Sequence, residues 1–280
     1  MEWLKSSARL AALLAIAAWT VSAGQLPRQE AAEPHMGTLV RLIFHAPDAT
    51  PARAAFDRVA ALDRALSDYA PGSSLNRLCR DQKAALTGEL ATIIPQALSI
   101  ARETEGAYDP TLAALTRHMP RPPSIYGYRN VTLNGLEISL NGVCFDLGGI
   151  AKGYAAQEAI RALATRGVRR ALAAVSGDIC VSGGPWRVGA QGRVATLHDT
   201  CISTSGNESQ PGHIFDPRTG LRLQREGQVT VLSRDGARAD ALATAYFITT
   251  PGGGWFDERP VSKRLSSAAP TRRGTPSRVR

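Results

Sequence analysis

The chain contains 280 residues, of which 44% are hydrophobic and 20% are charged. This balance is typical of a folded globular protein and excludes an intrinsically disordered or collagen-like chain. The net charge of +9 is concentrated at the C-terminal end, because residues 251–280 carry seven Lys or Arg against two acidic residues. No aromatic residues are interleaved among these basic ones, so we expect no nucleic-acid partner.

The first 23 residues have the pattern of a cleavable signal peptide. Lys5 and Arg9 precede an apolar run at 10–21, which is too short and too rich in alanine for a membrane span. A small-x-small pattern ends at Ala23, and no cysteine follows it that could accept a lipid. We therefore expect export to the periplasm, with an uncleaved anchor as the alternative.

Helices and antiparallel hairpins follow each other without a βαβαβ rhythm, which indicates an α+β fold. Asn134-Gly135 predicts a type I′ hairpin turn, because both residues tolerate positive φ. Beyond residue 251 the periodicity is lost, and we expect 251–280 to be a disordered basic tail without strands. In chain order, the patterns predict a strand at 38–45, helices at 51–69, 95–105 and from 110, a hairpin at 131–140, a strand from 143, a helix at 150–166, strands at 170–176, 178–182, 186–190, 194–204 and 228–233, and a helix at 239–249.

The four cysteines are Cys79, Cys144, Cys180 and Cys201. They form no CxxC motif and no cluster with histidine, which excludes a zinc or thiol-redox site of the usual spacing. The last three lie in apolar, strand-like stretches, where buried free thiols are the ordinary explanation. An oxidising compartment also permits disulfides, but the sequence does not pair the cysteines.

A glycine-rich turn is predicted between a strand and a helix at 146–154, with the sequence DLGGIAKGY. Its paired glycines let the backbone approach a ligand, and the N–H groups at a helix start favour phosphate. Lys152 lies in the first turn, where the helix dipole disfavours a cation, so an anion is expected nearby. A plain glycine turn is the alternative.

Three further stretches contain residue types that suit chemistry. Asp240 and Thr244 are four residues apart on one predicted helix face, and their hard oxygens suit Mg²⁺. His213 near an anion site would be a natural general base. Tyr108 and Asp109 lie at a predicted helix entrance. Each residue also has an ordinary structural explanation. Asp240 could be favoured by the helix dipole and His213 could lie on the surface. Tyr108 could belong to the core and Asp109 could cap the helix.

In this order, the stretches resemble the ApbE-like flavin transferases, which are FAD:protein FMN transferases. The resemblance covers residues 34–250. The motifs that carry it are Met-Gly-Thr at 36–38, LSxY at 66–69, GAYDPT at 106–111, DLGGIAKGYA at 146–155, SGDI at 176–179, TSG at 204–206, HxxDPRTG at 213–220 and ADALATA at 239–245.

The resemblance implies an α+β domain at 24–250 with two intimately packed subdomains around the flavin. It implies Mg²⁺-dependent transfer of the FMN half of FAD to a Ser or Thr hydroxyl of an exported acceptor domain, with release of AMP. The acceptor would belong to a membrane redox complex and would be the protein's only connection to a membrane. Positioning and charge neutralisation are what such phosphoryl transfer needs.

The resemblance also implies roles for individual residues. His213 matches the proposed base towards the acceptor hydroxyl. The magnesium ligands would be the side chains of Asp240 and Thr244 and the backbone carbonyl of Gly149. The positions that match FAD-binding residues are Met36, Tyr69, Ala107, Tyr108, Asp109, Asp146, Lys152 and Ile214.

The chain departs from the family pattern at several points. Gln157 replaces a usual Asp, Ser176 replaces the first Gly of a GGD triplet, and Cys79 replaces a common Asn. The family's strands beyond the ADALATA helix have no counterpart in the pattern at 252–280. Two alternatives are therefore kept: a Mg²⁺-dependent FAD pyrophosphatase that uses water, and a non-catalytic periplasmic FAD-binding accessory protein.

Overall fold

The computed structural model describes residues 26–116, 118, 123–208 and 212–259. The expected signal peptide and residues 260–280 lie outside this part of the chain. A mixed sheet of seven strands organises the fold, in the order β1-β2-β6-β7-β10-β13-β14. Neighbouring strands are antiparallel except β13 and β14, which run parallel. The strands are β1 (Arg28–His35), β2 (Thr38–His45), β6 (Ala171–Val175), β7 (Asp178–Ser182), β10 (Thr200–Gly206), β13 (Gln228–Ser233) and β14 (Gly254–Asp257).

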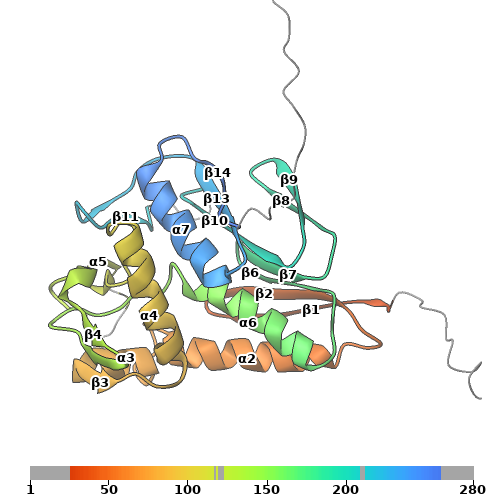
Figure 1. Cartoon of the computed structure of the whole chain (residues 1–280), viewed down its shortest axis with the longest axis horizontal. Helices are drawn as coiled ribbons and strands as arrows, with labels where there is room; N and C mark the ends of the chain where they lie inside the picture. Colours follow the sequence, from red (N-terminus) through yellow and green to blue (C-terminus); the bar gives the residue numbers. More distant parts are fainter. Residues whose placement is uncertain (1–25, 117, 119–122, 209–211, 260–280) are drawn as a thin grey trace, which may run out of the picture.

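Three helices pack on one face of this sheet (Figure 1). They are α2 (Pro51–Leu66), α6 (Ala151–Thr165) and α7 (Gly236–Thr249). Pro51 begins α2 because its fixed φ suits the first helical position and its missing N–H is not needed there. The apolar stripe of α2 is buried as the sequence predicts, with the residues Phe56, Val59, Leu62 and Leu66.

A hairpin of β8 (Trp186–Ala190) and β9 (Arg193–Leu197) packs on the opposite face of the sheet (Figure 1). Val188 and Leu197 of this hairpin are buried against Ile202 of β10. This second, smaller core lies on the other side of the sheet from the helices.

A second region lies at one end of the molecule (Figure 1). Its residues share one continuous buried core with the helices and the large sheet, which confirms an α+β fold with intimately packed parts. Its elements are α3 (Ser74–Asp81), β3 (Lys83–Ala85), α4 (Gly88–Glu103), α5 (Ala113–Thr116), the 3₁₀ turn η1 (Tyr128–Asn130), β4 (Thr132–Asn134) and β5 (Glu137–Ser139), and the short strands β11 (Phe215–Asp216) and β12 (Leu221–Arg222) lie nearby.

The α6–α7 crossing is close because both helices have glycine at the contact. A Cβ built on Gly153 would lie 2.1 Å from the carbonyl oxygen of Gly236. Alanines occupy much of the rest of α7, which is buried along most of its length. This close packing brings Asp240 of α7 against the start of α6.

Several predicted elements differ from those observed. Helix α4 begins at Gly88 rather than 95 and contains Pro95, because Leu90, Ile93 and Ile94 already form its buried stripe. Strand β1 was not predicted, since its half-buried residues alternate with exposed ones and the strand contains no apolar run. The predicted strand from 143 is reduced to a single bridge between Cys144 and Leu112.

The turn of the β4–β5 hairpin is also one residue away from the predicted position. Asn134 pairs with Glu137, so the two turn residues are Gly135 and Leu136. Positive φ occurs at Gly135 alone, as in a type II′ turn with glycine first, and the predicted type I′ turn was wrong.

The expected disordered tail at 251–280 needs correction at its start. Residues 254–257 form β14, which adds to the edge of β13 in parallel register. Trp255 and Phe256 are half-buried there, so this short segment has enough apolar surface to stay paired. The prediction that no strand follows the ADALATA motif was therefore wrong at residues 254–257.

The cysteines form two disulfides, which settles a question that the sequence left open between free thiols and disulfides. Cys79 of α3 is bonded to Cys144, and Cys180 of β7 is bonded to Cys201 of β10. The second pair lies directly opposite in the β7–β10 ladder. Such pairing depends on strand register, which the cysteine spacing does not encode.

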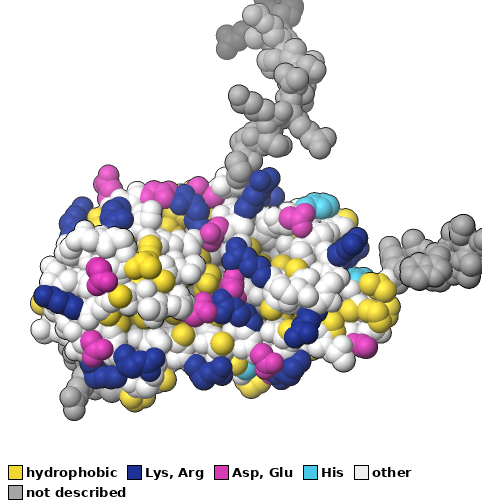
Figure 2. Space-filling view, turned by 60° about the horizontal axis from the view of Figure 1, so that its bottom comes forward, with side chains coloured by type: hydrophobic (Ala, Val, Ile, Leu, Met, Phe, Trp, Pro, Cys, Tyr) yellow, Lys and Arg dark blue, Asp and Glu magenta, His cyan; other side chains and the backbone are white. Residues whose placement is uncertain are grey.

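On the face shown in Figure 2, basic and acidic side chains are interspersed rather than gathered into a field of one sign. No helix in the described ranges combines the length and the apolar character that crossing a bilayer requires.

Candidate active site

One cavity of about 1420 Å³ lies where the helix layer, the β10 end of the sheet and the second region meet. It collects residues that are far apart in the sequence. All twelve residues singled out by the sequence and the resemblance line it: Met36, Tyr69, Ala107, Tyr108, Asp109, Asp146, Gly149, Lys152, His213, Ile214, Asp240 and Thr244.

The glycine-rich turn forms the entrance to α6 at this cavity. The Asp146 carboxylate accepts a hydrogen bond from the Gly148 amide at 2.8 Å and so fixes the turn. The Lys152 ammonium donates to the Gly148 carbonyl at 2.6 Å. No side chain caps the start of α6. The turn, the helix start and a cation therefore lie together, as an anion site requires.

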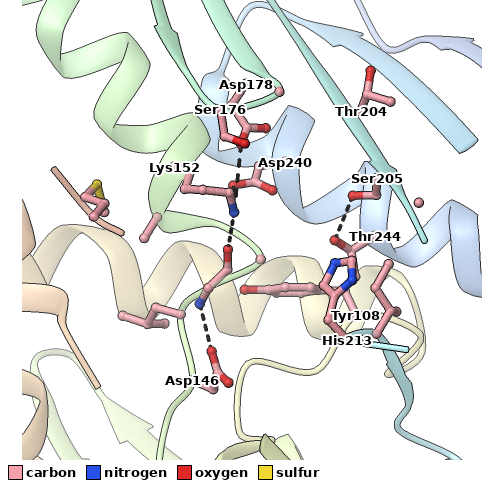
Figure 3. Close-up of a pocket in the computed structure, with 18 of the residues that line it drawn as sticks. Tyr108, Asp146, Lys152, Ser176, Asp178, Thr204, Ser205, His213, Asp240 and Thr244 are labelled. Atoms are coloured by element: carbon pink, nitrogen blue, oxygen red, sulfur yellow. Dashed lines mark hydrogen bonds and ion pairs between the residues drawn. The ribbon is translucent and has the colours of Figure 1, made fainter. Parts of the chain in front are cut away.

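Lys152 lies beside two buried carboxylates, as Figure 3 shows. Its Nζ is 3.9 Å from Oδ2 of both Asp178 and Asp240. Burial alone lowers the pKa of this ammonium, but the charges of Asp240, Asp178 and Asp146 raise it above its ordinary value. Lys152 is therefore charged at neutral pH.

Asp178 was not among the predicted site residues, although its SGDI motif was noted. It begins β7, directly after the β6–β7 turn, and is 3% exposed. Burial and then the charge of Asp240 raise the pKa of Asp178 to about 7. Burial also raises the pKa of Asp240. The acid at the end of a tight hairpin turn was the signal that could have identified Asp178.

The predicted magnesium ligands come from two neighbouring segments, the glycine-rich turn and α7. Asp240 and Thr244 share a face of α7, and a Cβ on Gly149 would lie 3.5 Å from Thr244 Oγ1. Ser205 of β10 exchanges a hydrogen bond of 3.1 Å with Thr244 (Figure 3). Hard oxygens beside a surplus of negative charge suit Mg²⁺, because Lys152 balances only one of the nearby carboxylates.

A second group with metal-ligand atoms lies at another part of the cavity wall. Asp68, His118 and Asp146 bring their ligand atoms within 4.8 Å of one another. The ring of His118 also stacks on Tyr69, with centroids 4.7 Å apart. Neither Asp68 nor His118 was predicted, because they are 50 residues apart and belong to no shared motif.

The GAYDPT stretch supplies a buried wall. Tyr108 is 3% exposed, and its hydroxyl has no hydrogen-bond partner among the described residues. Burial and the carboxylates of Asp240, Asp146 and Asp109 raise its pKa well above the ordinary value, so the hydroxyl keeps its proton. A polar ligand in the cavity would supply the partner that this hydroxyl lacks.

Asp109 has a local structural function that the sequence did not predict. Its Oδ1 accepts hydrogen bonds from the amide and hydroxyl of Thr111, and its Oδ2 accepts one from the Tyr128 amide. It therefore organises its loop instead of capping a helix.

Met36 and His213 enter the cavity from two other turns. Met36 has a φ of +53° in the β1–β2 turn, and its amide donates to Asp63 at 2.8 Å. His213 precedes Ile214, whose carbonyl accepts a bond from the Leu223 amide. Figure 3 shows the His213 imidazole on the same side of the cavity as Thr244.

Two departures from the family pattern are accommodated by the structure. Ser176 has a φ of +58° in the β6–β7 turn, which explains why glycine suits this position. Gln157 donates to the Arg234 carbonyl at 3.2 Å and accepts from the Gly236 amide at 3.0 Å. Its amide group thereby holds the start of α7.

Comparison with known proteins gives consistent matches. The family described as the "ApbE family" matches residues 36–256. An FAD:protein FMN transferase of Rhodobacter capsulatus is 29% identical to this chain over 84% of its residues. The chain spans 55% of the length of that relative. The enzyme of the same name from Salmonella typhimurium strain LT2 is 26% identical over 66% of this chain and 67% of its own length.

Solved structures are similar in fold. The apo form of the flavinyl transferase ApbE from Pseudomonas stutzeri has a TM-score of 0.73 over 83% of this chain and 87% of its own, at 21% identity. The flavin transferase ApbE from Vibrio cholerae has a TM-score of 0.69 over 81% of this chain and 88% of its own, at 25% identity. The chain thus has the same fold as these proteins.

Proposed function

The chain belongs to the ApbE family, as its motifs indicated, and from this membership we propose that it transfers the FMN part of FAD to a Ser or Thr hydroxyl of an acceptor protein. The observation that carries the proposal is the convergence of three groups on one cavity. These are the helix-start anion site with Lys152, the hard-oxygen set of Asp240 and Thr244, and His213.

The reaction is an in-line displacement at the phosphorus of the FMN half. The acceptor hydroxyl oxygen forms the new bond to that phosphorus, and the bond to the bridging oxygen of the diphosphate breaks. AMP leaves with the bridging oxygen, and the hydroxyl proton passes to His213 as general base.

Each residue has a defined task in this scheme. Lys152 and the start of α6 hold the diphosphate, and the Tyr108 hydroxyl supplies a donor inside the buried wall. Asp240, Thr244 and the Gly149 carbonyl would hold Mg²⁺, which neutralises charge on the diphosphate as the leaving group departs. Met36, Tyr69 and Ile214 line the cavity and would contact the rest of FAD.

We also propose that the protein works outside the cytoplasm on an exported acceptor domain of a membrane redox complex. The signal-peptide pattern at 1–23 supports this, and so do the two disulfides. Disulfides persist in oxidising compartments such as the periplasm.

Intact-protein mass spectrometry tests the proposal. The purified protein is incubated with FAD, Mg²⁺ and a purified flavin-acceptor domain of a membrane redox complex, with and without a chelator. We expect an FMN adduct on the acceptor that the chelator abolishes. Free FMN and AMP without an adduct would instead indicate the pyrophosphatase. FAD binding without either product would indicate an accessory protein.

A further inference from the structure

The cavity wall includes a strand edge that has no partner strand. Among the described strands, β8 pairs with β9 alone. Three residues of β8 line the cavity, namely Val188, Gly189 and Ala190, whereas none of β9 at 193–197 does. The unpaired edge of β8 is therefore beside the cavity, and the edge of β9 is not.

Hydrogen-bond geometry places the backbone of Gly189 on this open edge. The turn at 191–192 is closed by the pair Ala190 and Arg193, and the closing pair of a two-residue hairpin loop is hydrogen bonded. Bonded and non-bonded pairs alternate along an antiparallel ladder. The next pair is Gly189 and Val194, so the N–H and C=O of Gly189 point away from β9.

By the same geometry, Val194 is the residue of β9 that is equivalent to Gly189 of β8. Its N–H and C=O point out from the opposite edge of the hairpin, and the residue does not line the cavity. The two residues thus present equivalent backbone groups to different surroundings.

Strand β10 also lines this part of the cavity, through Ile202, Thr204, Ser205 and Gly206. Its pairing with β7 ends at Ile202. The β6–β7 turn approaches the next stretch, since a Cβ on Gly177 would lie 3.5 Å from the Thr204 carbonyl oxygen. The β10 side is therefore partly covered, and β8 offers the more open edge. Val188 and Ile202 pack in one buried cluster and both line the cavity, so they give this part of it an apolar floor.

The cavity is large for a ligand pocket. Its volume of about 1420 Å³ exceeds the roughly 300–1,000 Å³ of ordinary ligand pockets. The β8 edge lies in the same cavity as His213 and Thr244.

We propose that the acceptor protein enters as an extended segment that adds to the free edge of β8. Its main chain exchanges hydrogen bonds with Gly189, an apolar side chain contacts the floor, and its hydroxyl-bearing residue reaches the part of the cavity with His213. This inference rests on the proposed transferase function and specifies its partner. Strand addition obtains affinity from main-chain groups and so tolerates different acceptor sequences.

The test removes one hydrogen-bond donor from the open edge of β8. Gly189→Pro eliminates the outward N–H without breaking the β8–β9 ladder, since proline is tolerated at such edge positions. We expect the KM for the flavin-acceptor domain to rise by about tenfold or more, since a main-chain bond is lost and the proline ring blocks the edge. FAD affinity and melting temperature should remain those of the wild-type protein.

Two matched variants control for the proline itself. Val194→Pro removes the equivalent N–H from the edge of β9, and we expect its acceptor KM to be unchanged. Gly189→Ala adds a side chain but keeps the N–H on β8, where a Cβ would find no atom closer than 3.8 Å, so its acceptor KM should stay well below that of Gly189→Pro.

The outcomes separate this inference from the function on which it rests. Equal acceptor KM values for wild type and Gly189→Pro would overturn strand addition while leaving the transferase intact. Weaker FAD binding by Gly189→Pro would assign this part of the cavity to FAD and would also overturn the inference. If wild-type protein forms no adduct at all, the proposed function fails and the inference with it.

Discussion

The amide of Gly153 donates a hydrogen bond of 3.0 Å to Oδ2 of Asp240, across the crossing of α6 and α7. The contact depends on the absence of a side chain at Gly153. A Cβ there would lie 2.1 Å from the Gly236 carbonyl oxygen and 2.8 Å from the Asp240 Cβ. The position of a proposed metal ligand is therefore set by helix packing.

Changing Gly153 to Ala should separate the two helices. We expect a loss of roughly 1–3 kcal/mol in the free energy of unfolding, as for other overpacked cores, and a loss of transfer activity because Asp240 moves. Urea unfolding and adduct formation measure the two effects. Gly72→Ala is the control, because a Cβ there meets nothing within 4 Å. Wild-type activity in Gly153→Ala would contradict the argument.

Changing Asp240 to Asn keeps the shape of the side chain but removes its charge. We expect transfer to be abolished at limiting Mg²⁺, since the ion loses its one carboxylate ligand in the proposed set. Adduct formation over a Mg²⁺ titration measures this, with FAD affinity in chelator as the control for folding. Labelling that matches wild type at limiting Mg²⁺ would rule out Asp240 as a ligand.

Changing Lys152 to Ala removes the cation next to the start of α6. We expect FAD affinity to fall by about tenfold or more, because a charged donor to the diphosphate is lost, while the Mg²⁺ concentration for half-maximal activity changes less. Fluorescence titration of FAD measures the first effect. An unchanged FAD affinity would refute the anion site at this helix.

The buried acid Asp178 should make stability depend on pH in the metal-free protein. Its pKa rises from 3.8 to about 7 on folding, so between these values the folded state binds more protons than the unfolded state. Stability should therefore fall as pH rises from 4 to 7 and then level off.

Thermal melts in chelator over this range provide the measurement. Asp178→Asn, which has no charge to bury, should melt higher than wild type at pH 7 and show a weaker pH dependence. An identical pH profile in the two proteins would show that Asp178 is not the group responsible.

Much of the secondary structure followed from local patterns. The stripe of α2, the strands β6, β7, β8 and β13 and the helix α7 lie close to their predicted positions. These elements are periodic and apolar, so the residues themselves carry the signal. The errors at β1, β14 and the start of α4 arose where pairing or burial by distant segments decided the outcome. The strand expected from 143 and the type of the β4–β5 turn were also wrong, and the single strand expected at 194–204 is two strands, β9 and β10.

The sequence alone determined the α+β class, the family and the motifs that supply the glycine-rich turn and the Asp240–Thr244 pair, because these depend on residue type and short spacing. Tertiary structure alone decided that Asp178 flanks Lys152, that Cys79 pairs with Cys144, and that β8 presents an open edge to the cavity. Such contacts join residues tens of positions apart. Their proximity is set by sheet register and helix packing, which no local pattern encodes.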